Sequence, residues 1–234
     1  MIEPETWNAL FPKPNHFHLR LAFYFAGALT VFLYVGSISG EWLLSWDDQI
    51  YVVDNPLIKT ISMDNVLKIF SSFYYTDYHP LQLLSYMFDY ALWKSNPVGY
   101  RITNIVLHAI NGIMVFVITR KILAITSCIP AHDRNAVATA ASYIFLSHPT
   151  AVESVIWISE RKNVLSMAFM LMSFYAYITY REMELKKFFY LSILLFIFAL
   201  LSKASAVVLP IFIVLLDYSL YPVNNKHSKT VLLE

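Results

Sequence analysis

The sequence is poor in charged residues, cysteine and glycine, and each shortage excludes a class of protein. Only 14% of the 234 residues are charged and 58% are hydrophobic. A soluble domain carries about a quarter charged residues, so the composition indicates a polytopic membrane protein. The one cysteine, Cys128, allows no intrachain disulfide. Five glycines without a glycine-rich phosphate loop disfavour a kinase or ATPase, and a net charge of +1 disfavours nucleic acid as a partner.

Long apolar runs predict an all-α polytopic membrane protein with about six transmembrane helices. A helix rises ~1.5 Å per residue and the hydrocarbon core is ~30 Å thick, so the shorter runs would tilt or re-enter. The expected spans are residues 19–39, 100–118, 136–146, 164–180, 188–201 and 206–220. The first run is too long for a signal-peptide core, so we interpret it as a retained signal-anchor helix.

Lys and Arg residues in the short loops predict that both ends of the chain are cytoplasmic. With that orientation, ten of the seventeen Lys and Arg residues lie on the cytoplasmic side. The predicted organisation is a cytoplasmic tail (1–18), a membrane domain (19–221) and a second cytoplasmic tail (222–234). Residues 40–99, hereafter segment 40–99, form the first outer loop.

Two amphipathic patterns in segment 40–99 predict helices that lie in the membrane interface. In residues 62–74, Val66, Phe70 and Phe73 form one helical face opposite Asp64, Lys68 and Ser71. A second pattern puts Leu81, Leu84, Phe88 and Leu92 opposite the polar residues Gln82, Ser85 and Asp89.

Asp47 and Asp48 are the first candidates for catalysis. They follow the first span and are flanked by Trp46 and Tyr51. Adjacent carboxylates near apolar surroundings repel each other and are partly desolvated, which favours a general base. The alternative is a pair of solvated acids at a helix exit.

The second predicted span carries a polar stripe. Its residues are spaced i, i+3, i+7 and i+10 and so share one helical face: Arg101, Asn104, His108 and Asn111. Polar groups at membrane depth are functional candidates, and hydrogen bonds between helices are the alternative.

Further candidates follow the third and fifth spans. Glu153 has a concrete structural alternative, because Thr150 and Glu153 have the spacing of a helix capping box. Arg161 and Lys162 fit either a phosphate clamp or side chains that snorkel to the interface. The same two readings apply to Lys203, as a cation for a lipid head group or a snorkelling residue.

The histidines lack the spacing of metal ligands, so no metal site is assigned. An oxygen-ligand site for a divalent cation, built from Asp47, Asp48 and Glu153, stays an alternative.

Several motifs, in order, resemble the polytopic O-mannosyltransferases that carry tetratricopeptide repeats and their bacterial relatives. The first is Trp-Asp-Asp-Gln-Ile-Tyr-Val at 46–52 with Asn-Pro at 55–56. Tyr-His-Pro-Leu at 78–81 and Asn-Pro-Val-Gly-Tyr-Arg at 96–101 follow, and then the polar stripe of the second span. The longest similarity is residues 148–163, and Leu-Ser-Lys at 201–203 continues the order. The resemblance covers residues 20–220.

The resemblance implies a type-C glycosyltransferase in a bacterial inner membrane or the endoplasmic reticulum. Such an enzyme uses a polyprenyl-phosphate-linked sugar and a protein or glycan acceptor on the non-cytoplasmic side. By analogy, Asp47 or Asp48 deprotonates the acceptor hydroxyl and Glu153 orients the site. The substrate-binding residues by the same analogy are His148, Arg161, Lys162, Lys203, Arg101 and His108.

Members of that family continue with further membrane helices, and many with a repeat domain, and this sequence has neither. The alternative reading is therefore a truncated, noncatalytic membrane module that needs a partner chain. A small transporter fits poorly, because interfacial helices and paired loop acids are not expected in one.

Overall fold

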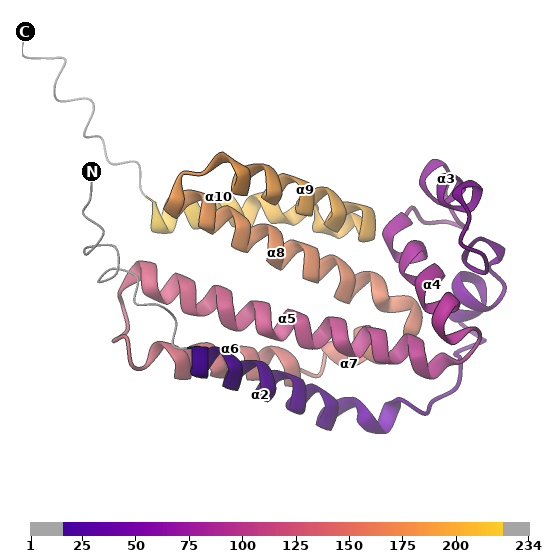
Figure 1. Ribbon diagram of the computed structural model, residues 1–234, viewed down its shortest axis with the longest axis horizontal. Helices are drawn as coiled ribbons and strands as arrows, with labels where there is room; N and C mark the ends of the chain where they lie inside the picture. Colours follow the sequence, from indigo (N-terminus) through magenta and orange to yellow (C-terminus); the bar gives the residue numbers. More distant parts are fainter. Residues whose placement is uncertain (1–15, 222–234) are drawn as a thin grey trace, which may run out of the picture.

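The computed structural model describes residues 16–221, and its named elements are all helices (Figure 1). The long helices are α2 (His16–Tyr34), α5 (Pro97–Thr126), α6 (Arg134–Ser147), α8 (Arg161–Met183), α9 (Lys186–Ser202) and α10 (Leu209–Leu220). The shorter α-helices are α3 (Met63–Ser71), α4 (Pro80–Trp93) and α7 (Ala151–Ile156). Single turns complete the chain: η1 (Val35–Ser37), η2 (Gln49–Val53), η3 (Pro56–Ile58), η4 (Ile158–Glu160) and η5 (Ala204–Val208).

The long helices form an elongated bundle around α5 (Figure 1). Helices α2 and α6 pack on one side of α5 and α8 packs on the other, with α9 and α10 beyond α8. Segment 40–99 folds into α3, α4 and the short turns η2 and η3 at one end of the bundle. The start of α2 and the end of α10 lie at the opposite end (Figure 1).

Each predicted span coincides with a helix, although the bounds differ. Helix α5 (Pro97–Thr126) begins before the predicted span 100–118 and extends beyond its end. The sixth run is broken, because η5 precedes α10. At ~1.5 Å per residue, the 14 residues of α6 rise only ~21 Å. Apart from residues 16–18, which begin α2, the predicted cytoplasmic tails lie outside the described residues.

Within residues 24–221, α5 is the one helix long and apolar enough to cross a membrane. A buried core helix of a soluble protein meets the same criterion, so α5 alone is weak evidence for a membrane. The structure therefore gives an all-helical bundle with one candidate span, and the six predicted crossings are not established.

Helix α4 turns its predicted polar side toward the protein. Gln82 and Asp89 are buried, whereas Phe88 and Leu92 are 61% and 76% exposed. Two polar contacts hold this side of α4 inward. The Gln82 amide donates a hydrogen bond to the carbonyl of Ser159 at 2.7 Å, and Asp89 forms an ion pair with Arg161. The apolar stripe of α4 thus faces away from the bundle.

Helix α3 differs from its prediction in a similar way. Ile69, outside the predicted apolar face, is the residue that enters the core, and Phe73 is 73% exposed beyond the end of the helix. The helix starts at Ser62, whose hydroxyl accepts a hydrogen bond from the N–H of Asn65 at 3.2 Å.

Segment 40–99 has an apolar core of its own that continues into the bundle. Its centre is Tyr51, Ile58 and Ile69 together with buried residues of α4, and it includes Ile158 of η4. The turn η4 between α7 and α8 is therefore one of the points at which segment 40–99 meets the bundle, beside the direct packing of α4 on α5, α8 and α9.

Candidate functional site

Asp47 and Asp48 have different surroundings. Asp48 has no exposed surface, and its Oδ1 accepts hydrogen bonds from the N–H (2.9 Å) and the hydroxyl (2.5 Å) of Ser159. Its Oδ2 accepts from the N–H of Leu43 at 3.2 Å. A buried carboxylate with both oxygens bonded to protein donors is satisfied by the fold itself. Asp48 ties segment 40–99 to η4.

Asp47 is partly exposed and lies near Tyr51, the residue whose hydroxyl contacts a second carboxylate, Asp77. The Tyr51 hydroxyl donates to Oδ2 of Asp77 at 3.0 Å. Burial raises the pKa of Tyr51 well above its ordinary value, and the hydrogen bond to Asp77 and the charges of Asp77 and Asp47 raise it further. The phenol therefore stays protonated between two carboxylates.

Tyr51 lies on η2, a single π-helical turn. Its wide turn is closed by the hydrogen bond from the N–H of Asp54 to the carbonyl of Gln49 at 2.8 Å. Such turns are rare and occur frequently at functional sites, because they redirect a side chain. Here the π-helical turn carries Tyr51, whose hydroxyl reaches Asp77.

His79 lies next to these acids, just before α4. Its Nδ1 is 3.8 Å from Oδ2 of Asp77, and this buried nitrogen has no hydrogen-bond partner within the described chain. Burial lowers the pKa of His79, Asp77 opposes this, and the positive charges of Lys162 and Lys203 lower it further. His79 is thus a neutral ring between carboxylates and cations.

Lys162 and Lys203 form the cationic side of this group. Lys162 Nζ lies 3.1 Å from Oε1 of Glu160, and Glu160 Oε2 accepts a hydrogen bond from the Asn163 amide at 2.6 Å. The other end of that amide, the Asn163 oxygen, accepts a hydrogen bond from Lys203. Two lysines from different helices are thus held on opposite ends of one Glu160–Asn163 pair.

Lys203 keeps an uncompensated charge in this arrangement. Its partner Asn163 is neutral, and none of the ion pairs in the described range 24–221 includes Lys203. The ammonium of Lys203 turns toward Asn163 of α8, and both interpretations of Lys203 stay predictions. We call Asp47, Tyr51, Asp77, His79, Glu160, Lys162, Asn163 and Lys203 the acid–lysine cluster.

Arg161 is a structural residue, and both of its predicted roles are wrong. It has no exposed surface, so it neither snorkels nor forms a surface phosphate clamp. Its guanidinium lies 2.5 Å from Oδ2 of Asp89 and donates to Oδ1 of Asn104 at 2.7 Å. The rings of Tyr86 and Tyr100 lie 4.6 and 5.7 Å from it. These contacts join α8 to α4 and α5.

The polar stripe of α5 forms hydrogen bonds between helices, as its alternative interpretation predicted. Arg101 donates to the carbonyls of Gly40 and Glu41. Asn104 donates to the carbonyl of Val155 at 3.2 Å. The remaining two are His108, 3.2 Å from the Leu146 carbonyl, and Asn111, which donates to the Val164 carbonyl at 2.9 Å.

Glu153 and His148 lie apart from the acid–lysine contacts, around α7. The predicted capping box is absent: the Thr150 side chain makes no cap hydrogen bond and instead contacts His148 Nδ1 at 2.7 Å. Glu153 is exposed. Among the described residues, no group of three His, Cys, Asp or Glu side chains lies close enough to hold a metal ion, Asp47, Asp48 and Glu153 included.

Sequence reasoning missed Asp77, Asp89, Asn163 and the neutral role of His79. Gln82 and Asp89 are spaced i, i+7 in an otherwise apolar helix, a signal that α4 points polar groups inward. The Tyr-His-Pro motif at 78–80 was visible, but its spacing does not indicate the proximity of His79 to lysines from two distant helices.

Three known proteins are similar to this chain. It is 25% identical over 186 residues to protein O-mannosyl-transferase F38B6.6 of Caenorhabditis elegans, covering 75% of this chain and 25% of that protein. It is 30% identical over 157 residues to protein O-mannosyl-transferase Tmtc1 of Drosophila melanogaster, covering 66% and 17%. The human protein O-mannosyl-transferase TMTC3 is 27% identical over 100 residues, covering 43% and 10%.

The chain is therefore distantly homologous to these transferases, and it matches a quarter or less of the length of each. No family model matches the sequence. No solved structure shows significant similarity to it.

The Arg161–Asp89 ion pair should contribute strongly to stability. Asp89→Asn leaves a fully buried guanidinium without a counter-charge, which costs about 3–5 kcal/mol. Asp217→Asn is the matched control, because Asp217 pairs with Arg181 where both side chains are about a third exposed, and such a loss costs about 0–1 kcal/mol. Thermal unfolding in detergent, followed by circular dichroism, measures both. Equal effects of the two substitutions would contradict the role of the buried pair.

The lowered pKa of His79 predicts a pH-dependent stability. Below its ordinary pKa of about 6.5 the unfolded chain binds a proton that folded His79 does not, so the unfolding free energy falls as pH drops below ~7. His79→Gln should show a smaller loss between pH 7 and pH 5.5. His132→Gln, at an 81% exposed side chain, should match the unaltered chain. A fall as steep in His79→Gln as in the unaltered chain argues against this environment for His79.

Proposed function

We propose that this chain, a distant homologue of protein O-mannosyl-transferases, transfers a sugar from a polyprenyl-phosphate donor to a hydroxyl acceptor. By the same homology, the sugar is mannose and the acceptor a protein. The observation that supports this best is the acid–lysine cluster, in which Asp77, Glu160, Lys162 and Lys203, from three parts of the chain, act on one neutral histidine. Such a site offers a base to a hydroxyl and cations to a phosphate.

Asp47 is the proposed base. Asp48 is fully bonded in the interior, whereas Asp47 is partly exposed beside Tyr51 and Asp77. The acceptor hydroxyl gives its proton to the carboxylate as its oxygen attacks the anomeric carbon. The bond from that carbon to the phosphate oxygen breaks, and the phosphate leaves with the electron pair. One direct displacement inverts the configuration at the carbon.

Lys203 and Lys162 are the proposed phosphate ligands. The leaving phosphate gains negative charge in the transition state, and fixed cations there stabilise it more than they stabilise the bound donor. Lys203 is the better placed of the two, because its partner Asn163 is neutral whereas Lys162 is paired with Glu160. Arg161 does not bind phosphate in this proposal; it positions Lys162 and Asn163 by fixing the start of α8.

The membrane arrangement is part of the same proposal. The six long helices cross the bilayer with both ends of the chain cytoplasmic, and α3 and α4 lie at the outer interface. The outward apolar stripe of α4, with Phe88 61% and Leu92 76% exposed, supports contact with lipid there. The location is a bacterial inner membrane or the endoplasmic reticulum, as the resemblance implies.

A noncatalytic module that needs a partner membrane chain is the second candidate. Helix α10 favours it, because a large apolar surface on this helix has no partner within the described chain. Its most exposed residues are Ile211 (62%), Val214 (66%) and Tyr218 (83%). A surface of this kind fits either lipid or further helices.

Transfer of radiolabelled mannose from polyprenyl phosphate, in membranes that contain the chain, tests the proposal. Asp47→Asn should reduce the rate about 100-fold or more, the range of a lost general base. Asp64→Asn, which alters an exposed acid in α3, should leave the rate unchanged. Full activity of Asp47→Asn would exclude the proposed base, and no transfer by the unaltered chain would favour the noncatalytic module.

A further inference from the structure

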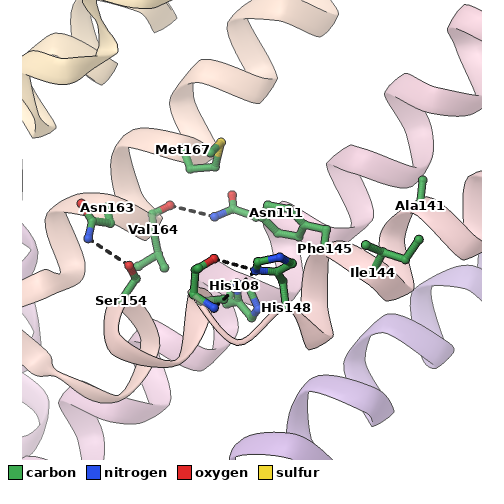
Figure 2. A pocket seen from close by; sticks show the side chains of 12 residues that line it. His108, Asn111, Ala141, Ile144, Phe145, His148, Ser154, Asn163, Val164 and Met167 are labelled. Atoms are coloured by element: carbon green, nitrogen blue, oxygen red, sulfur yellow. Dashed lines mark hydrogen bonds between the residues drawn. The ribbon is translucent and has the colours of Figure 1, made fainter.

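A pocket of about 440 Å³ lies between α6 and α8 and shares Asn163 with the acid–lysine cluster. Helices α6 and α8 both pack against α5 but make little contact with each other, so a wedge stays open over α5. His108 and Asn111 of α5 form its floor, and Ser154 of α7 lies at one end (Figure 2). Thr150, just before α7, also lines it. We call this space the α6–α8 pocket.

The floor of the α6–α8 pocket contains an unsatisfied acceptor. Asn111 is 1% exposed, and its amide N–H donates to the carbonyl of Val164 at 2.9 Å (Figure 2). This bond fixes the orientation of the amide, because a flipped Asn111 would set two oxygens against each other. Its Oδ1 has no hydrogen-bond partner in the described chain. A buried acceptor left unpaired costs free energy, so a donor is expected there.

The two histidines that line the pocket have complementary tautomers. His148 Nδ1 accepts a hydrogen bond from the N–H of Thr150 at 3.3 Å, so in the neutral ring the proton is on Nε2, a donor. His108 Nε2 lies 3.2 Å from the carbonyl of Leu146, which only accepts, so this nitrogen carries the proton and Nδ1 is an acceptor. The pocket therefore offers both acceptors and a donor.

The chemistry of the lining excludes a charged ligand. None of the described residues that line the α6–α8 pocket is an Asp, Glu, Lys or Arg. The walls are apolar and include Ile144, which is 62% exposed, and Phe145 and Met167. An uncharged group that both donates and accepts a hydrogen bond, carried on an apolar body, matches this lining.

We propose that the α6–α8 pocket binds a neutral membrane lipid through its hydroxyl group. The hydroxyl donates to Asn111 Oδ1 and accepts from His148 Nε2, and its apolar chain leaves past Ile144. This site is distinct from the proposed phosphate site, although Asn163 belongs to both: it lines the pocket and accepts a hydrogen bond from Lys203.

Photolabelling of the purified full chain in lipid nanodiscs tests this site, with a diazirine-bearing farnesol as the probe. Label is expected on the peptide that contains residues 141–154. The methyl ether of the probe keeps the apolar body but cannot donate to Asn111, so it should label about tenfold less, the cost of one unmade buried hydrogen bond. Equal labelling by the alcohol and the ether would overturn the proposal.

Substitutions locate the label. Ala141→Phe fills the pocket from α6 and His148→Phe removes the donor, so both should reduce labelling about tenfold. Val137→Phe introduces the same side chain one turn earlier on α6, outside the pocket, and should leave labelling unchanged. A reduction by Val137→Phe as large as that by Ala141→Phe would contradict the assignment.

Competition identifies the ligand class. Unlabelled farnesol, cholesterol or diacylglycerol should displace the probe, in an order that shows which membrane alcohol fits best. Farnesyl phosphate at the same concentration should displace it less than twofold, because the pocket holds no cation. Displacement by none of the alcohols, or by the phosphate as strongly as by farnesol, would overturn the inference whatever the outcome of the transfer assay.

Discussion

The buried ion pair of Arg161 and Asp89 is the contact on which the rest of this structure depends. A guanidinium with no exposed surface has to be neutralised and hydrogen-bonded, and the chain supplies Asp89, Asn104 and two tyrosine rings to do so. These partners come from α4 and α5, so satisfying one side chain fixes where three helices meet. The inward polar side of α4 follows directly from this requirement.

The candidate site follows from the same junction. Arg161 is preceded by Ser159 and Glu160 and followed by Lys162 and Asn163. Ser159 bonds Asp48, Glu160 bonds both Lys162 and Asn163, and Asn163 also bonds Lys203. Ser159 holds Asp48 and with it the turn that carries Asp47. Asn163 accepts a hydrogen bond from Lys203, the residue that follows α9. The residues next to a structural arginine thus hold both the turn that follows Asp47 and the lysine that acts on His79.

Periodicity and apolar runs predicted the helices, because these follow from local sequence. Residues 100–118 and 164–180 lie within α5 and α8, and Ser62 begins α3 as a polar N-cap. The environment of single side chains could not be predicted, because it depends on contacts distant in sequence. Asp48 and Asp47 are chemically identical neighbours, yet only Asp48 meets Ser159, 111 residues away. The same holds for Arg161, whose burial requires Asp89.

The most direct test of this account is the accessibility of positions 47 and 48. In a Cys128→Ser background, Asp47→Cys, Asp48→Cys and the exposed control Gln49→Cys are treated with a membrane-impermeant maleimide from the non-cytoplasmic side. Positions 47 and 49 should be modified in the folded protein, and position 48 only after denaturation. Modification of position 48 as fast as position 47, or of position 47 only from the cytoplasmic side, would contradict the account.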